Sequence, residues 1–157
     1  MRSPLSTLAI GILVVAAAMV TATSPSIAST VSSGGGTLEL GPPTPIWEHA
    51  IGSELLTYED GSLGFGGTIA GSGTIYVLAV VSANGTETFV AHWSAVATVD
   101  GQSGVVNISL DGTDNGTYSG GMVAYGTGKL AGFVGEGRFT GQDATGAGTY
   151  TLSYVEG

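Results

Sequence analysis

The sequence contains no cysteine. Disulfide bonds and thiol chemistry are therefore excluded, and stability must come from buried apolar surface and backbone hydrogen bonds. Basic side chains are almost as scarce, since three Lys and Arg residues stand against twelve Asp and Glu residues and the net charge is −9. Phosphate contacts require clustered Lys and Arg, so we expect no nucleic-acid partner. Binding to anionic membrane surfaces is disfavoured for the same reason.

Long apolar runs are also rare. The first is residues 8–20, which follows Arg2 and precedes the small-residue site Ser26-Ile27-Ala28. The run is shorter than the roughly 20 residues that span a membrane as a helix. It predicts a secretory signal peptide, residues 1–28, that is cleaved near Ala28, although a retained membrane anchor is the alternative. We therefore expect a secreted or extracytoplasmic protein whose mature chain does not insert stably into a membrane.

The mature chain is long enough for one domain with a single core. Its first residues, 29–36, are rich in serine and glycine and are typical of a flexible linker. Residues 37–157 then form the predicted domain. From residue 62 to the end, no segment has the pattern of a capped amphipathic helix.

Turn signals divide the domain into short extended segments. Asn84-Gly85, Asp100-Gly101 and Asn115-Gly116 each predict a hairpin turn, and a further turn is expected over residues 70–73. Residues 47–58 fit both helical spacing and strand alternation, and we assign them mostly to strand. The predicted strands are residues 37–40, 62–69, 74–82, 86–99, 104–110, 117–125, 133–140 and 148–155. Eight or nine strands at this spacing indicate an antiparallel barrel or sandwich.

The segment at residues 126–139, GTGKLAGFVGEGRF, has five glycines. Glycine in a strand usually marks a bend, a bulge or a close approach of two backbones. The segment therefore predicts a barrel corner, with Leu130, Phe133, Val134 and Phe139 turned inward.

Alternation predicts which faces are buried. Phe89, Ala91 and Trp93 share one face of their strand, and Tyr150, Leu152 and Tyr154 share one face of the last strand. Residues 75–81, IYVLAVV, are apolar on both faces, so the outer face needs a cover. We expect a contact between subunits of a homo-oligomer, a dimer or a trimer; the alternative is cover by residues 47–58.

Four stretches carry a resemblance to a known family: residues 63–80, 85–113, 126–139 and 148–154. They are similar to an uncharacterised bacterial family, a domain of unknown function, whose members resemble allene oxide cyclase in fold. The most specific match is the Gly-Thr-Gly-x-Leu-x-Gly-x-x-Gly-x-Gly run that leads into the final strand. The resemblance implies an all-β domain, an eight-stranded antiparallel β-barrel like that of allene oxide cyclase and dirigent proteins, commonly assembled as dimers or trimers. It implies no activity.

An eight-stranded barrel has room inside for packed side chains or one small apolar ligand. We therefore expect a secreted barrel that binds a small hydrophobic molecule or has a structural role, with no cofactor. The alternative, which rests on the resemblance, is a cyclase-like or dirigent-like enzyme that steers a reactive intermediate within the barrel. The sequence leaves open whether the protein is an enzyme.

Few residues are candidates for chemistry. Glu39 resembles a glutamate that allene oxide cyclases hold inside the barrel, and an inward carboxylate would have a raised pKa. Alternation favours the other interpretation, in which Glu39 faces solvent and its neighbouring leucines point inward. Tyr76, Tyr150 and Tyr154 are candidate ligand-binding residues. The two histidines, His49 and His92, lack the spacing of a metal site, so we expect no metal.

Overall fold

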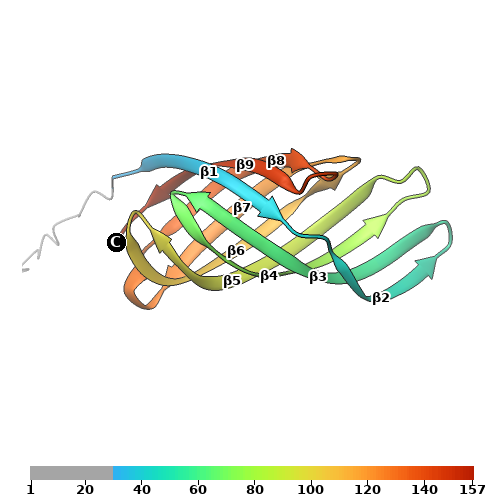
Figure 1. Ribbon diagram of the computed structural model, residues 1–157, viewed down its shortest axis with the longest axis horizontal. Coiled ribbons are helices and arrows are strands. Elements are labelled where there is room, and N and C mark those ends of the chain that lie inside the picture. The colour runs from blue at the N-terminus through green and yellow to red at the C-terminus, as the bar shows by residue number, and fades with distance from the viewer. Residues whose placement is uncertain (1–29) are drawn as a thin grey trace, which may run out of the picture.

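The computed structural model describes residues 30–157, so the predicted signal peptide lies outside the described residues. This part of the chain is almost entirely strand (Figure 1). The elements are β1 (Ser32–Leu40), β2 (Thr44–Ile51), β3 (Glu54–Gly67), β4 (Ile69–Val81), β5 (Glu87–Val99), β6 (Gln102–Asp114), β7 (Thr117–Thr127), the short 3₁₀ helix η1 (Gly128–Leu130), β8 (Val134–Gln142) and β9 (Ala147–Val155). Over the same residues, no helix has the length and hydropathy needed to cross a membrane.

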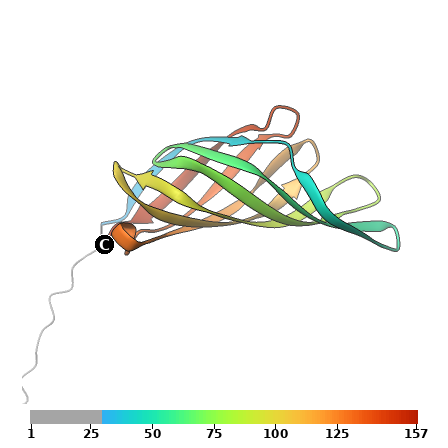
Figure 2. The same cartoon turned by 60° about the horizontal axis from the view of Figure 1, so that its bottom comes forward.

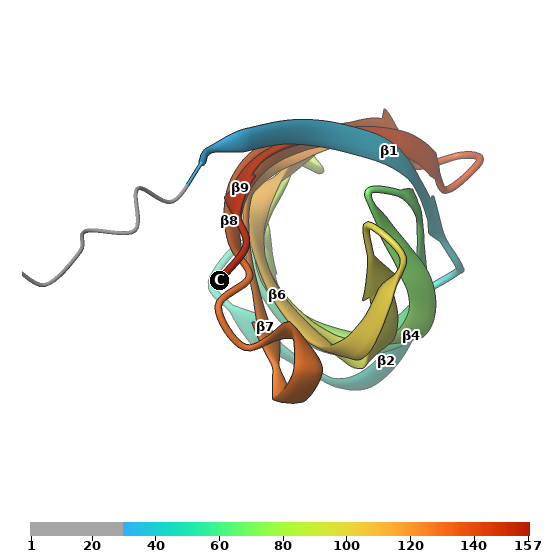
Figure 3. The ribbon, with the colours of Figure 1, turned by 90° about the vertical axis from the view of Figure 1, so that its left-hand side faces the viewer.

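The sheet closes on itself. From β3 to β9 each strand pairs antiparallel with the next, and β1 pairs with both β9 and β3. These pairings make a closed ring of eight strands, and the view along the barrel shows the ring (Figure 3). The predicted eight-stranded antiparallel barrel is therefore confirmed.

The ninth strand, β2, lies outside the ring. The prolines after Gly41 interrupt the ladder, since proline has no N–H to donate. As a result β1 pairs with the second half of β3, and β2 pairs with its first half. The β2–β3 hairpin extends from one end of the barrel (Figure 2). The ambiguous residues 47–58 thus include a turn at Gly52, whose φ is +63°, rather than one strand.

Two predictions about glycine-rich segments are wrong. The predicted linker, residues 29–36, mostly belongs to β1, which begins at Ser32. A Cβ on Gly36 would lie 1.7 Å from the carbonyl oxygen of Gly66, so these glycines allow β1 to approach β3. The turn expected at residues 70–73 lies instead at Gly67, whose φ is +103°. Residues 70–73 belong to β4.

The interior follows the predicted alternation. The ring of Phe65 (β3) packs edge to face against two other aromatic rings. Its centroid lies 5.1 Å from that of Trp93 (β5) and 5.5 Å from that of Tyr150 (β9). The corner segment behaves as expected at Leu130 and Phe133, which are buried at the end of the barrel where η1 lies. Val134, by contrast, is 51% exposed, because β8 begins there and alternation turns it outward. We call this end the packed end, and the end with the β2–β3 hairpin the open end.

Candidate functional site

The barrel interior is left partly empty toward the open end. A cavity of about 100 Å³ lies there and is open to solvent on one side. Its apolar wall comes from β1, β3, β4, β5, β6 and β8, chiefly through Leu38, Leu63, Ile75, Ala91, Leu110 and Phe139. We call this cavity the cup.

The cup exists because the interior side chains change in size along the barrel. Gly61 and Ala91 line the cup, whereas Trp93, the next inward residue of β5, fills the interior below it. The Trp93 indole Nε1 donates a 3.0 Å hydrogen bond to the Leu63 carbonyl. The Tyr150 hydroxyl accepts from the Ile69 N–H at 2.8 Å. These bonds satisfy the polar atoms of the aromatic layer and give the cup a packed floor.

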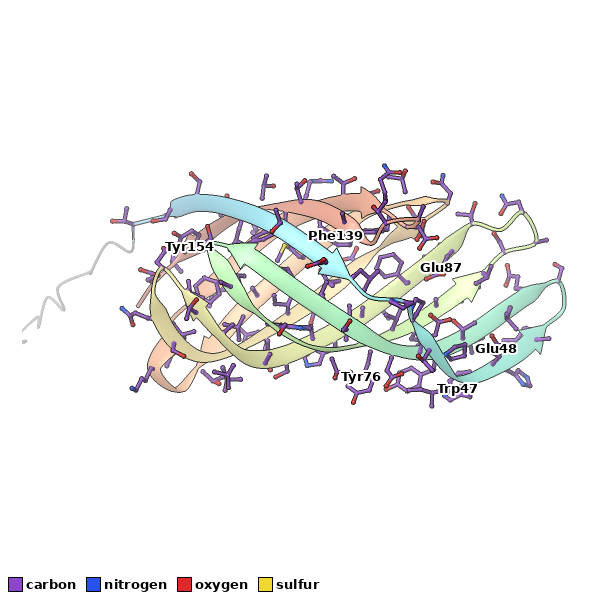
Figure 4. The ribbon with its side chains drawn as sticks, viewed as in Figure 1. Trp47, Glu48, Tyr76, Glu87, Phe139 and Tyr154 are labelled. Atoms are coloured by element: carbon purple, nitrogen blue, oxygen red, sulfur yellow. The ribbon has the colours of Figure 1, made fainter. Side chains whose placement is uncertain are left out.

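Four carboxylates lie at the mouth of the cup: Glu59 of β3, Glu87 of β5, Asp114 of β6 and Asp143 of the β8–β9 turn. Glu87 is half-buried and extends toward the same space as Phe139 (Figure 4). Burial, and then the negative charges of Glu59, Asp114 and Asp143, raise the pKa of Glu87 to about 6. We call these four residues the acidic rim.

The acidic rim has no basic neighbour among the residues that line the cup. Lys129 belongs to η1 at the packed end, and Arg138 is exposed on the outer face of β8. Within residues 30–157, no three His, Asp or Glu side chains are grouped closely enough to hold a metal ion. The rim is therefore a spread of negative charge around an apolar opening.

Tyr118 of β7 also lines the cup but is already engaged. Its hydroxyl donates a 2.8 Å hydrogen bond to the Gly146 carbonyl. Burial and the charges of Asp114 and Asp143 raise its pKa above the ordinary value. Tyr118 therefore stays neutral near pH 7 and braces the β8–β9 turn against the wall.

The structure does not bring the predicted site residues together. Glu39 is exposed on the outer face of β1, because Leu38 and Leu40 take the inward positions. Tyr76 is 44% exposed on the outer face of β4. Tyr150 and Tyr154 lie inside the barrel, but Tyr150 is bonded to Ile69 and Tyr154 donates to Asp100 near the packed end. The bond to Asp100, more than burial, raises the pKa of Tyr154 to about 12.

Sequence reasoning missed the acidic rim. Glu87 could have been recognised from strand alternation. It lies two residues before Phe89 on β5 and therefore on the same inward face as Phe89, Ala91 and Trp93. Asp114 lies directly opposite Glu87 in the β5–β6 register. That pairing follows from the turn between the strands, so these two acids could have been placed together.

The outer face of β4 is uncovered. Tyr76, Leu78 and Val80 are 44%, 40% and 38% exposed. β2 lies beside β3 in the sheet rather than across β4, so residues 47–58 reach the outer face of β4 only at Tyr76 and leave Leu78 and Val80 exposed. Trp47 packs beside Tyr58 at 6.0 Å, and Tyr58 stacks on Tyr76 at 6.3 Å. The Trp47 and Tyr76 side chains lie on the outside, away from the cup (Figure 4).

Comparison with known proteins places this architecture in a family. Residues 54–154, which run from the start of β3 to the penultimate residue of β9, match the family described as "Protein of unknown function (DUF3224)". The chain belongs to the DUF3224 family. A crystal structure of a DUF3224 protein of unknown function from Shewanella oneidensis MR-1 is similar, with a TM-score of 0.63 and 19% identity over 82% of this chain and 98% of that one. At this identity the likeness shows the DUF3224 fold alone. No curated protein matches the chain.

Proposed function

We propose that this DUF3224 barrel is an exported binding protein that holds a small apolar molecule in the cup. The observation that supports this is a cavity of about 100 Å³ with Leu, Ile and Phe walls and a packed aromatic floor. An apolar space of this size has room for the hydrocarbon part of a small molecule only. The ligand part inside the cup is therefore a short alkyl chain or a single ring.

The lining favours binding over catalysis. Among the described residues that line the cup there is no histidine, serine or lysine, and the Tyr118 hydroxyl is engaged with Gly146. The carboxylates lie at the mouth and leave the apolar wall uninterrupted below them. A wall of this kind selects a ligand by shape and apolar surface.

Titration with 1-hexanol, followed by amide NMR shifts, tests the proposal. We expect shifts at Ala91, Leu110 and Phe139, which line the cup. Gly61→Leu should abolish them, because a Cβ at Gly61 has room, with its nearest heavy atom at 3.6 Å, and a longer side chain would extend into the cup. Ala91→Leu fills the cup from β5 and serves as a second blocking variant.

Val96→Leu is the outer-face control, because it enlarges a side chain away from the cup, where Val96 is 69% exposed. It should leave the affinity for 1-hexanol unchanged. Absence of binding, or equal binding by folded Gly61→Leu and Ala91→Leu variants, would overturn the proposal.

A further inference from the structure

The acidic rim and the apolar cup together define a two-part site. The apolar part is enclosed by the strands, and the rim carboxylates come from β3, β5, β6 and the β8–β9 turn, so negative charge surrounds the opening. Glu87 is half-buried and faces Glu59, Asp114 and Asp143, with the neutral Tyr118 on the same wall. Like charges held together in a half-buried place destabilise one another until a cation arrives.

We propose that the ligand of the cup is a cationic amphiphile, a small alkyl- or arylamine whose hydrocarbon part fills the cup and whose ammonium group lies among the carboxylates of the acidic rim. The ammonium N–H groups donate to the rim carboxylates. This inference rests on the proposed function, because it specifies the chemistry of the molecule that the cup holds.

Other ligand charges fit the mouth less well. An anionic amphiphile, such as a fatty acid, would bring a fifth negative charge to the rim. A bare metal ion lacks a compact ligand set, since no group of three His, Asp or Glu side chains within residues 30–157 can hold one. An ammonium group suits carboxylates that are spread around an opening. Its three N–H donors point in different directions, so it can donate to carboxylates on more than one side.

Three probes with the same hydrocarbon part separate charge from apolar binding: hexylammonium, 1-hexanol and hexane-1-sulfonate. We expect hexylammonium to bind the purified protein about tenfold tighter than 1-hexanol at low salt, and the sulfonate to bind more weakly than the alcohol. Raising the salt concentration to about 0.5 M should reduce the difference in affinity between hexylammonium and 1-hexanol, because salt screens the solvent-exposed carboxylates of the acidic rim.

Glu87→Gln tests the source of the preference. It should lower the hexylammonium affinity at least about threefold relative to the 1-hexanol affinity of the same variant. Glu136→Gln is the matched control, because Glu136 is exposed on the outer face of β8 and its loss changes the net charge equally. It should leave both affinities unchanged.

The outcomes distinguish this inference from the proposed function. If 1-hexanol binds in the cup and hexylammonium binds no tighter, the cationic ligand is overturned and the binding function stands. Equal losses in Glu87→Gln and Glu136→Gln would also overturn it, since the preference would then come from net charge alone. If none of the probes binds, both proposals fail.

Discussion

The fold alters the ionisation of Glu87, whose pKa is raised to about 6 from an ordinary value of 4.5. Glu87 therefore holds its proton more tightly in the folded state than in the unfolded state. As a result the free energy of unfolding falls as the pH rises from 4.5 to about 6. Glu87→Gln should stabilise the protein by up to about 1 kcal/mol near pH 7.5, a value reduced for the solvent exposure of Glu87. The gain should vanish near pH 4. Urea unfolding at the two pH values measures this, and an equal gain at both would contradict it.

Thr57→Val removes the buried unpaired hydroxyl while keeping the side-chain shape. We expect the ligand-free protein to gain about 1 kcal/mol in its free energy of unfolding, because an unsatisfied buried polar group is destabilising. Thr98→Val is the control, since the Thr98 hydroxyl donates to the Ala70 carbonyl at 3.4 Å. It should bring no gain. Denaturant unfolding compares the two variants, and a loss in Thr57→Val would show that its hydroxyl has a partner.

Single residues could be assigned to a face from the sequence, but could not be gathered into a site. Parity along a strand predicted that Trp93 and Tyr150 point inward, and it favoured an outward Glu39. The acidic rim depends on which residues of distant strands reach the same height in the barrel. That height is set by the register of the whole closed ring, which no local pattern contains.

Among the elements, the η1 corner closes the packed end through Leu130, which is 5% exposed. Leu130→Ala should lower the free energy of unfolding by about 2–4 kcal/mol, because it leaves a cavity in the core. Val134→Ala, on the exposed start of β8, should change it by less than about 0.5 kcal/mol. Thermal or urea unfolding measures both. Similar values for the two variants would show that η1 does not seal the barrel.

β1 depends on glycine for its contact with β3. Gly36→Ala should destabilise the protein by about 1–3 kcal/mol, because its Cβ would overlap the Gly66 carbonyl oxygen, 1.7 Å away. Gly64→Ala is the control on the facing strand, where the nearest heavy atom to a Cβ lies at 3.9 Å. It should be close to neutral in urea unfolding. Equal stability of the two variants would mean that β1 can shift away from β3 at little cost.

The elements were predicted well where turns have their own signals. Asn84-Gly85 and Asn115-Gly116 lie at hairpin turns, as expected. The linker and the turn at residues 70–73 were wrong for one reason. Gly36, Gly71 and Gly73 are needed for close approach to neighbouring backbone or side chains, and in the sequence they look the same as flexible glycines.

At the scale of the whole molecule, closure of the barrel could be predicted, and the place of the ninth strand outside the ring could not. The number of strands and their alternation indicated a barrel or sandwich, and the resemblance chose the barrel. β3 pairs with β2 along its first half and with β1 along its second half. The point of change depends on where the prolines interrupt the pairing with the ring. That position follows from the tertiary register and not from the local sequence.

Association into a homo-oligomer stays a prediction. The exposed residues Tyr76, Leu78 and Val90 on adjacent strands form the outer apolar face that motivates it. Sedimentation of the purified protein should show a dimer or a trimer, and Leu78→Lys should shift it to monomer because a charge in an apolar interface is costly. A wild-type monomer at all concentrations would contradict the prediction.

β2 is held to the rest of the molecule along one edge only; within residues 30–157 its other edge pairs with no strand. The corner before it contributes Pro43 to the wall of the cup. Detachment of β2 would therefore widen the entrance without breaking a hydrogen bond between the strands of the ring. A ligand held in the cup as we propose would then exchange on the timescale of a local opening, while the barrel itself stays folded.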